Sequence, residues 1–212
     1  MNPKLVVKGI NGVIEGGVSV IDFSVICELD EITAKELLYT LVQNGIGVFS
    51  NDLVNFEIPN DRLQTALFAI NLGATVEEVS EYLTWRDFES LTGLILEQKD
   101  FEVTKNLILT KPRMEIDVIG KKMNIALLID CKHWKNMSKS ALDGIVKKQI
   151  ERVRRYVSDE NISALPVIVT LHQEIQFINN VPIVPIMKLS SFLDEFVGNL
   201  DSLKSIGKAK KN

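Results

Sequence analysis

Hydrophobic side chains recur at helical spacing through the first 83 residues. Positions 63, 66, 67 and 70 are all apolar, which predicts one buried stripe along a helix. Three sequences, at Ser19, Thr33 and Thr75, pair a hydroxyl residue with an acid three positions later and therefore predict helix starts. This part of the chain is expected to be mostly helical, with a short strand-like run after Lys4.

A predicted hairpin interrupts these helices. Two strand-like runs, residues 46–49 and 53–58, flank the polar turn at residues 50–52. The order helix, helix, hairpin, helix over roughly residues 15–72 resembles a winged helix-turn-helix domain. An unspecialised small α+β domain would have the same order and remains the alternative.

Strands alternate with helices from Thr84 onward. A capping sequence at Thr84 opens a helix to about Gln98, and a longer helix is expected over residues 140–157. The expected strands are residues 101–109, 113–119, 124–132 and 165–171, followed by an extended run at 176–187 and a helix at 190–200. The order α-β-β-β-α-β predicts an α/β fold (α+β for the whole chain), with a mixed sheet covered on both faces. Two helix signals abut near Thr84, so we predict domains at residues 1–83 and 84–212.

Composition narrows the class of protein. The chain has 212 residues, of which 46% are hydrophobic and 25% charged, as in ordinary globular proteins. No apolar run is long enough to cross a bilayer, so we expect a cytoplasmic protein that does not enter membranes. Two cysteines, Cys27 and Cys131, cannot form a disulfide framework or a four-cysteine zinc site.

Charge divides unevenly between the two predicted domains. Residues 1–83 contain 4 Lys or Arg and 12 Asp or Glu, whereas residues 84–212 contain 20 and 16. The net charges are therefore −8 and +4. A polyanion such as nucleic acid is a plausible partner for the second part and not for the first.

The most informative residues follow the apolar run at 125–129. Asp130 and Lys132 are two positions apart, so they share one face at the end of a strand that is otherwise suited to burial. A buried carboxylate and ammonium cost free energy unless both are paired. A cation and a phosphate meeting at that edge would explain both residues, and a structural ion pair is the alternative.

Two more acids are expected near this strand end. Asp117 lies on the polar face of the preceding strand, which can pair with residues 124–132 as a hairpin through Gly120-Lys121-Lys122 and place Asp117 beside Asp130. Converging carboxylates repel each other, and a divalent cation relieves that repulsion. Glu89 lies on the helix opened by Thr84 and is the third acid. Hard oxygen ligands favour Mg²⁺ or Mn²⁺ over zinc.

This arrangement resembles the PD-(D/E)xK nuclease superfamily, over about residues 84–187. Glu89 on a helix, Asp117 on a strand and Asp130-Cys131-Lys132 on the next strand match its motifs in order. The sequence around residues 85–103 is similar to Mrr-type restriction endonucleases and archaeal Holliday-junction resolvases. Ile116 replaces the proline of the motif, and Asp130 stands where Glu is commoner.

The resemblance implies a role for each residue. Asp117, Asp130, the Cys131 carbonyl and Glu89 would bind the metal, Glu89 directly or through water. Lys132 would orient or deprotonate the attacking water and offset charge on the phosphate. Gln149 matches a further polar position of some families and completes the expected catalytic set; a buried core glutamine is the alternative. The expected nucleic-acid contacts are Arg113, Trp134, Lys135 and Lys139.

The sequence therefore predicts a metal-dependent nuclease, acting on DNA rather than RNA and working as a homodimer. One alternative is a non-catalytic nucleic-acid-binding protein that keeps the nuclease fold. Another is a winged-helix transcription regulator, for which a cationic recognition helix is expected. Residues 33–43 offer only Lys35, next to Glu36, which does not favour that alternative.

Overall fold

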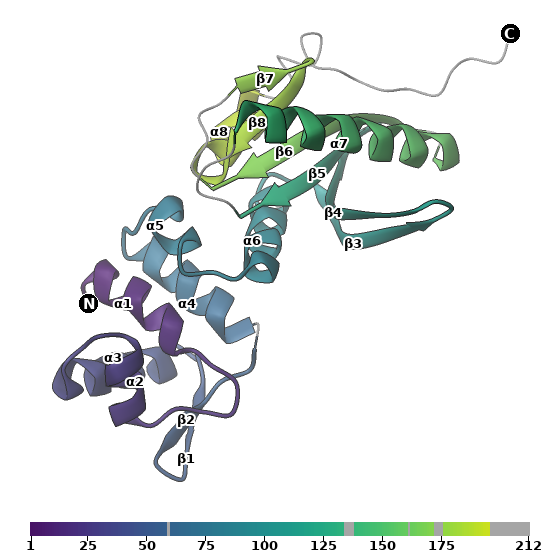
Figure 1. The fold of residues 1–212 in the computed structure, drawn as a ribbon. Helices are drawn as coiled ribbons and strands as arrows, with labels where there is room; N and C mark the ends of the chain where they lie inside the picture. The colour runs from purple at the N-terminus through teal and green to yellow at the C-terminus, as the bar shows by residue number, and fades with distance from the viewer. Residues whose placement is uncertain (59, 134–137, 161, 172–175, 196–212) are drawn as a thin grey trace, which may run out of the picture. The chain divides into compact units, whose positions relative to one another are not determined.

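The computed structural model describes residues 1–58, 60–133, 138–160, 162–171 and 176–195. The chain divides into two compact units, Met1–Asp87 and Phe88–Asn212 (Figure 1). The fold is mixed α/β, as the sequence predicts.

The N-terminal unit is built mainly of helices. Its elements are α1 (Pro3–Gly9), a 3-10 turn (Ile10–Gly12), α2 (Val20–Ile26), α3 (Glu31–Gln43), β1 (Val48–Ser50), β2 (Leu53–Asn55), α4 (Asn60–Asn71) and α5 (Val76–Ser80). β1 and β2 form the expected antiparallel hairpin, and Asn51 and Asp52 at its turn have positive φ angles of 50° and 62°. Phe23, Leu37 and Leu41 are fully buried and form part of the core.

Two predictions for this unit are wrong in detail. The strand-like run after Lys4 is helix α1, because the Asn2 side chain caps its first turn and Pro3 occupies the first helical position. Helix α3 begins at Glu31, because Asp30 rather than Thr33 is its cap: the Thr33 backbone N–H donates to the Asp30 carboxylate at 2.9 Å. The caps at Ser19 and Thr75 are confirmed.

Both cysteines are free thiols. Cys27 is buried in the N-terminal unit, and burial raises its pKa to about 12. A thiol that stays protonated at neutral pH is a packing residue and not a nucleophile.

The C-terminal unit contains a six-stranded mixed sheet. Helix α6 (Trp85–Glu97) leads into β3 (Glu102–Thr110), β4 (Arg113–Lys122), β5 (Ile125–Lys132), α7 (Lys139–Asp159), β6 (Ser163–Thr170), β7 (Gln176–Ile178), β8 (Val181–Pro185) and α8 (Ile186–Glu195). The strand order is β3-β4-β5-β6-β8-β7. β3, β4 and β5 are antiparallel neighbours, whereas β5, β6 and β8 run parallel.

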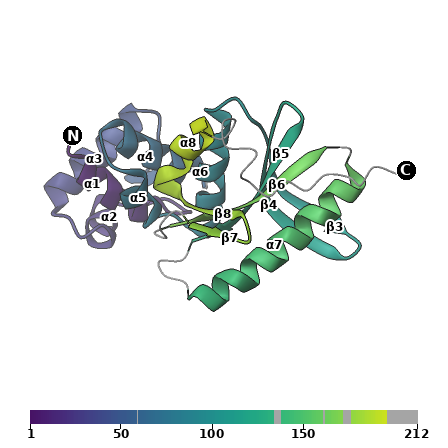
Figure 2. The same cartoon turned by 90° about the horizontal axis from the view of Figure 1, so that it is seen from above.

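Helices cover both faces of this sheet (Figure 2). α7 lies along one face, where Val153 and Tyr156 pack against Leu128 of β5. The other face carries α8 and the part of α6 that belongs to this unit. Leu127 and Ile129 of β5 are as completely buried as Leu128, so the strand is covered from both sides.

The β4–β5 turn lies later than the sequence analysis placed it. Gly120 pairs with Leu127 inside the strands, and the chain turns at Met123 and Asn124. This strand position is a glycine because a Cβ atom there would lie only 3.0 Å from the Leu96 side chain of α6. The predicted turn glycine is therefore a site of close helix packing.

The end of the chain also differs from expectation. The extended run at 176–187 is the hairpin β7–β8, which turns at Asn179 and Asn180, both with positive φ. Helix α8 starts at Ile186, four residues before the expected start at 190. The basic tail at residues 208–211 lies outside the described residues.

The longest described helix, α7, has 21 residues and exposes charged side chains such as Lys147 and Arg154. No helix in the described part of the chain is both long and apolar enough to cross a membrane.

Candidate active site

The regular backbone pairing between β4 and β5 ends next to Asp117 of β4. β4 and β5 pair from Lys122↔Ile125 to Val118↔Ile129. Beyond that pair the Cys131 backbone N–H donates to Asp117 Oδ2 at 2.7 Å. The carboxylate of Asp117 thus takes the acceptor position that a backbone carbonyl would have in a regular ladder.

The other neighbour of β4 is irregular at the same level. β3 pairs with β4 on both sides of this point, through Lys105↔Val118 and Leu107↔Ile116, but not at Asn106. Asn106 has a positive φ of 55°. The ladder is therefore interrupted on both sides of Asp117.

Asp130 lies beside Asp117 in a buried position. Its side chain is only 1% exposed, and β6 supports its backbone through the parallel pair Asp130↔Ile168. Burial and the neighbouring charge of Asp130 raise the pKa of Asp117, and the hydrogen bond from the Cys131 N–H opposes them. The two carboxylates are therefore close enough for the charge of one to act on the other.

Two cations neutralise Asp130. Lys132 Nζ lies 2.7 Å from Asp130 Oδ2, and Arg152 Nη1 donates to Asp130 Oδ1 at 2.6 Å. The Lys132 ammonium is at ion-pair distance, yet Oδ2 accepts no hydrogen bond of regular geometry within the described residues. A buried carboxylate oxygen in this state has capacity left for another positive ligand.

Helix α7 supplies the second half of this network. Gln149 is fully buried, and its Nε2 donates to the Leu128 carbonyl of β5 at 2.7 Å. Its Oε1 accepts from Arg152 Nη1 at 3.2 Å. Gln149 is thus tied to both the strand and the cation that holds Asp130.

Arg152 is the residue that sequence reasoning missed. In the sequence it looks like one more cation on the polar face of the helix at 140–157, which also carries Lys147, Lys148, Arg154 and Arg155. The available signal was its spacing: Arg152 is three residues after Gln149 and so shares the face that looks toward β5.

Glu89 of α6 is linked to β5 by its electrostatic effect on Cys131. Its side chain on α6 is 6% exposed, and Cys131 Sγ lies 3.6 Å from Thr92 Oγ1 of the same helix. Burial, then Asp117, then Glu89 and Asp130 raise the pKa of the Cys131 thiol, against the Thr92 hydrogen bond. Cys131 alternates with Asp130 along β5 and lies against α6 through its contact with Thr92.

The carboxylates do not form one tight cluster. In the described ranges, no three His, Cys, Asp or Glu side chains lie close enough to hold a metal ion together. Asp117 and Asp130 lie at the strand end, where the Lys132 ammonium also donates to the Cys131 carbonyl at 3.4 Å. A role for Glu89 as a ligand, direct or through water, stays a prediction.

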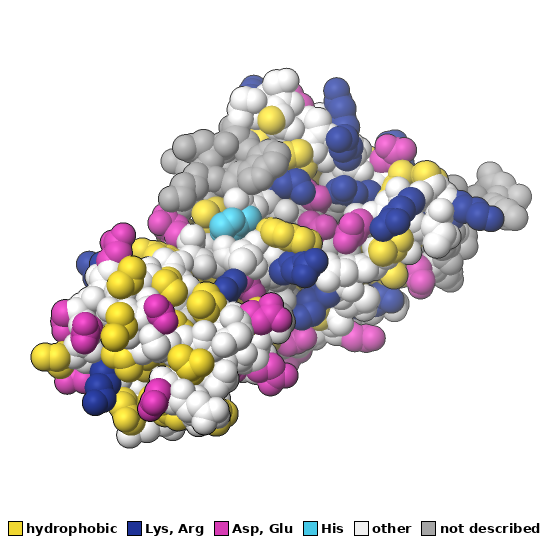
Figure 3. Space-filling model, turned by 60° about the horizontal axis from the view of Figure 1, so that its bottom comes forward, with side chains coloured by type: hydrophobic (Ala, Val, Ile, Leu, Met, Phe, Trp, Pro, Cys, Tyr) yellow, Lys and Arg dark blue, Asp and Glu magenta, His cyan; other side chains and the backbone are white. Residues whose placement is uncertain are grey.

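The expected nucleic-acid contacts lie in several places. Arg113 is exposed at the start of β4, and Lys139 is exposed at the first residue of α7. Trp134 and Lys135 lie outside the described residues. Figure 3 shows Lys and Arg side chains gathered on the visible face of the C-terminal unit, with acidic side chains among them.

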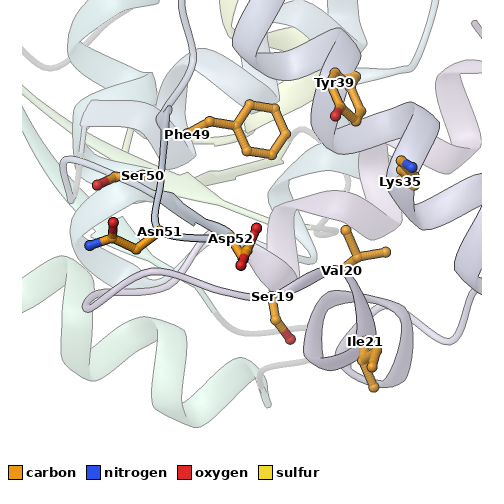
Figure 4. A pocket seen from close by; sticks show the side chains of 9 residues that line it. All are labelled: Ser19, Val20, Ile21, Lys35, Tyr39, Phe49, Ser50, Asn51 and Asp52. Atoms are coloured by element: carbon orange, nitrogen blue, oxygen red, sulfur yellow. The ribbon is translucent and has the colours of Figure 1, made fainter.

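The N-terminal unit contains an open hollow of about 660 Å³. It is lined by Ser19, Val20, Ile21, Lys35, Tyr39, Phe49, Ser50, Asn51 and Asp52 (Figure 4). The ring centroids of Tyr39 and Phe49 lie 4.7 Å apart with the ring planes tilted by 43°, and Lys35 Nζ lies 5.9 Å from the Tyr39 ring centre. One lysine, one aspartate and apolar walls are suited to packing against another molecule rather than to acid–base chemistry.

The similarity of this chain to known proteins is found in structure and not in sequence. No protein-family profile matches the sequence, and a search of curated proteins finds no match. Protein VC1899 from Vibrio cholerae is similar in structure over 94% of this chain and 52% of its own, with 16% identity and a TM-score of 0.43. This chain thus spans about half the length of that protein.

Two further structures are similar over about half of this chain. The small subunit of the heterodimeric restriction endonuclease R.BspD6I matches 55% of this chain and 70% of its own, with 14% identity and a TM-score of 0.38. AF1548, a protein of unknown function, matches 53% and 54%, with 17% identity and a TM-score of 0.32. At this level of similarity, the function has to be inferred from the side chains of this chain.

Proposed function

We propose that this chain hydrolyses phosphodiester bonds of nucleic acid with Mg²⁺ or Mn²⁺, and that DNA is its substrate. The observation that carries the proposal is the meeting of Asp117, Asp130 and Lys132 at one buried strand end. Two adjacent carboxylates in a buried place are costly, and a divalent cation relieves their repulsion. Asp130 Oδ2 accepts no regular hydrogen bond in the described structure, and it would bind such a cation in place of the Lys132 ammonium that lies 2.7 Å away.

The order of elements supports a specific fold assignment. α6, β3, β4, β5, α7 and β6 follow each other as α-β-β-β-α-β. We assign residues 84–212 to a restriction-endonuclease-like core of the PD-(D/E)xK type on this order and on the four motif positions. The helices and hairpin of the N-terminal unit support a winged-helix-like assignment.

The residues present suit a hard cation. Asp117, Asp130 and the Cys131 carbonyl would hold it, with Glu89 binding directly or through water, and all of these donors are oxygens. A bound Mg²⁺ or Mn²⁺ supplies a water of lowered pKa and polarises the scissile phosphoryl group.

Lys132 acts on the attacking water and the phosphate, and Gln149 positions the strand. The Lys132 ammonium orients the attacking water by a hydrogen bond and offsets charge that builds on the phosphate oxygens. The new bond joins the water oxygen to phosphorus while the water loses a proton to solvent, and the bond from phosphorus to the leaving sugar oxygen breaks. Gln149 positions β5 by its hydrogen bond to the Leu128 carbonyl.

Cleavage of labelled nucleic acids tests the proposal directly. The purified protein is incubated with single-stranded, duplex, flapped and four-way DNA, and with matched RNA, with and without Mn²⁺. We expect Mn²⁺-dependent cleavage of at least one DNA. Binding without cleavage of any substrate would instead favour the non-catalytic nucleic-acid-binding protein.

We expect the DNA-binding surface to lie in the C-terminal unit. Affinity for duplex DNA depends on neutralising phosphates, and the N-terminal domain at residues 1–83 has a net charge of −8. Arg113→Gln and Lys139→Gln should each weaken duplex binding several-fold and lower the salt dependence by about one ion. Fluorescence anisotropy at several salt concentrations, in Ca²⁺ to prevent cleavage, measures both.

Lys35→Gln is the matched control, because Lys35 is the basic residue of the presumed reading helix α3. It should leave DNA binding unchanged. Loss of binding in Lys35→Gln, with no change in the other two variants, would assign DNA recognition to the N-terminal unit and favour the transcription regulator.

We propose that the N-terminal unit joins two copies of this chain. β1 pairs with β2 alone among the described strands, and all three of its residues are exposed. Val48 is 67% exposed on this strand, and Val25 and Ile32 on the neighbouring helices are 72% and 74% exposed. An open strand edge can pair with its own symmetry mate, since a two-fold contact uses the same surface twice.

Light scattering tests this contact. The wild-type protein should have twice the chain mass of 23.8 kDa, and Val48→Lys should shift it toward the monomer because a lysine on the edge opposes strand pairing. Met123→Lys is the matched control, since Met123 is 71% exposed at the β4–β5 turn of the other unit. A monomeric wild type at every concentration would rule the dimer out.

A further inference from the structure

The Arg152 guanidinium makes the best-defined contact to the candidate metal site. Its Nη1 donates to Asp130 Oδ1 at 2.6 Å and to Gln149 Oε1 at 3.2 Å. Gln149 is in turn anchored to the Leu128 carbonyl at 2.7 Å. The cation is thus fixed to β5 through a fully buried amide rather than held by one surface ion pair.

Arg152 and Lys132 use different oxygens of the same carboxylate. Lys132 lies at Oδ2, the oxygen without a regular hydrogen bond in the described residues, so it has to leave for a metal ion to bind there. Arg152 binds Oδ1, and a metal ion at Oδ2 leaves that hydrogen bond in place. Of the two cations, Arg152 is therefore the one that can remain bound to Asp130 when a metal ion binds at Oδ2.

Two cations, Lys132 and Arg152, pair with Asp130 in the site without metal, and Asp117 is a second acid beside them. If Arg152 is removed, the buried Asp130 and the half-buried Asp117 are left with the single ammonium of Lys132. The folded state without metal then loses an ion pair whose acid is 1% exposed, which is strongly destabilising.

We propose that Arg152 is a resident counter-ion that keeps the acidic site folded without metal and weakens its affinity for divalent cations. This inference rests on the proposed function, because it concerns the same metal site. A positive charge held on Oδ1 repels a dication bound at Oδ2 of that carboxylate. Arg152 thereby makes the site dependent on a high cation concentration.

Loss of Arg152 has two opposing effects on metal binding. The Asp130 side chain gains freedom, which disfavours binding, but fixing the few torsions of one Asp costs little. The lost repulsion between unit charges a few ångströms apart is larger, even with screening near the surface. The net expectation is tighter binding.

Calorimetric titration with Mn²⁺ and thermal unfolding in EDTA test the inference without any activity assay. Arg152→Gln should bind Mn²⁺ at least about tenfold more tightly than the wild type. It should also unfold at a lower temperature in EDTA and gain more stability from Mn²⁺. Arg152→Lys retains the charge and should return Mn²⁺ affinity toward the wild-type value.

Arg154→Gln is the matched control, because it removes the same charge from an exposed position of the same helix. It should change Mn²⁺ affinity less than twofold. A variant Arg152→Gln that folds only with millimolar Mn²⁺ is the extreme form of the expected result. A variant that folds in neither condition contradicts it.

The failures of the two proposals are distinguishable. If the wild type binds Mn²⁺ and Arg152→Gln binds it equally or more weakly, Arg152 is a structural or positioning residue and the counter-ion role is overturned. If neither the wild type nor any variant binds Mn²⁺, the proposed metal-dependent function falls, and this inference falls with it.

Discussion

Replacing Asp130 with Asn, or Lys132 with Ala, is expected to lower the rate of nucleic-acid cleavage by at least about 100-fold while the fold survives. Asn at position 130 can still accept the Arg152 hydrogen bond but offers no charge to a metal ion. Ala at position 132 removes the donor at the phosphate and leaves Asp130 paired with Arg152. Single-turnover cleavage rates at saturating protein measure the loss.

Surface variants of the same type serve as controls. Asp100→Asn changes a carboxylate whose side chain is 92% exposed, and Lys188→Ala removes an exposed lysine of α8. Both should cleave at the wild-type rate. Circular dichroism and thermal unfolding verify the fold of each variant. Normal cleavage by both Asp130→Asn and Lys132→Ala would show that these residues form a structural ion pair.

Removal of divalent cations is expected to abolish cleavage completely, and Mn²⁺ or Mg²⁺ to restore it. Asp117, Asp130 and the Cys131 carbonyl are oxygen donors, which bind such ions reversibly. Ca²⁺ should support substrate binding better than cleavage, because its coordination is larger and less regular. Cleavage and anisotropy are measured on the same protein after dialysis against EDTA.

The order in which ions are added makes this test specific. Activity should return with Mn²⁺ after EDTA treatment and fall again when excess Ca²⁺ competes for the site. Full activity in EDTA would mean that the carboxylates at the strand end act without metal, and the metal-dependent mechanism would be wrong.

Local signals in the sequence predicted the local structure well. The cap at Thr84 is present: the Asp87 backbone N–H donates to the Thr84 hydroxyl at 3.3 Å, the Thr84 N–H donates to Asp87 Oδ2 at 3.0 Å, and α6 starts at the next residue. The caps at Ser19 and Thr75 form in the same way, since each needs residues only three positions apart. The helix α1 was misread because an apolar run of a few residues has no clear period, although Asn2 and Pro3 gave the correct signal.

Signals that depend on distant contacts were harder to interpret. Gly120 was predicted as a turn residue because glycine is common in turns, but its reason for being there is the packing of Leu96 from another element. The shared face of Asp130 and Lys132 followed from strand alternation and is present in the structure.

Arg152 illustrates the limit of periodicity. The polar residues of α7 look alike in sequence, but Arg154 is exposed and Arg152 reaches Asp130. Which polar residue turns inward depends on where β5 places a buried carboxylate. A helical wheel of residues 140–157 does not show where that carboxylate lies. The three-residue spacing of Arg152 from Gln149 indicates only that the two share one face of the helix.

The hydrogen bond from the Cys131 amide to Asp117 makes one backbone proton a reporter on the whole site. In an ordinary ladder an amide proton exchanges with solvent at a rate set by the opening of the strands. Here its acceptor is a carboxylate, so any ion that draws charge from Asp117 also weakens the hold on that proton. Nuclear magnetic resonance of this single amide would thus register occupancy of the site in a protein with no substrate present.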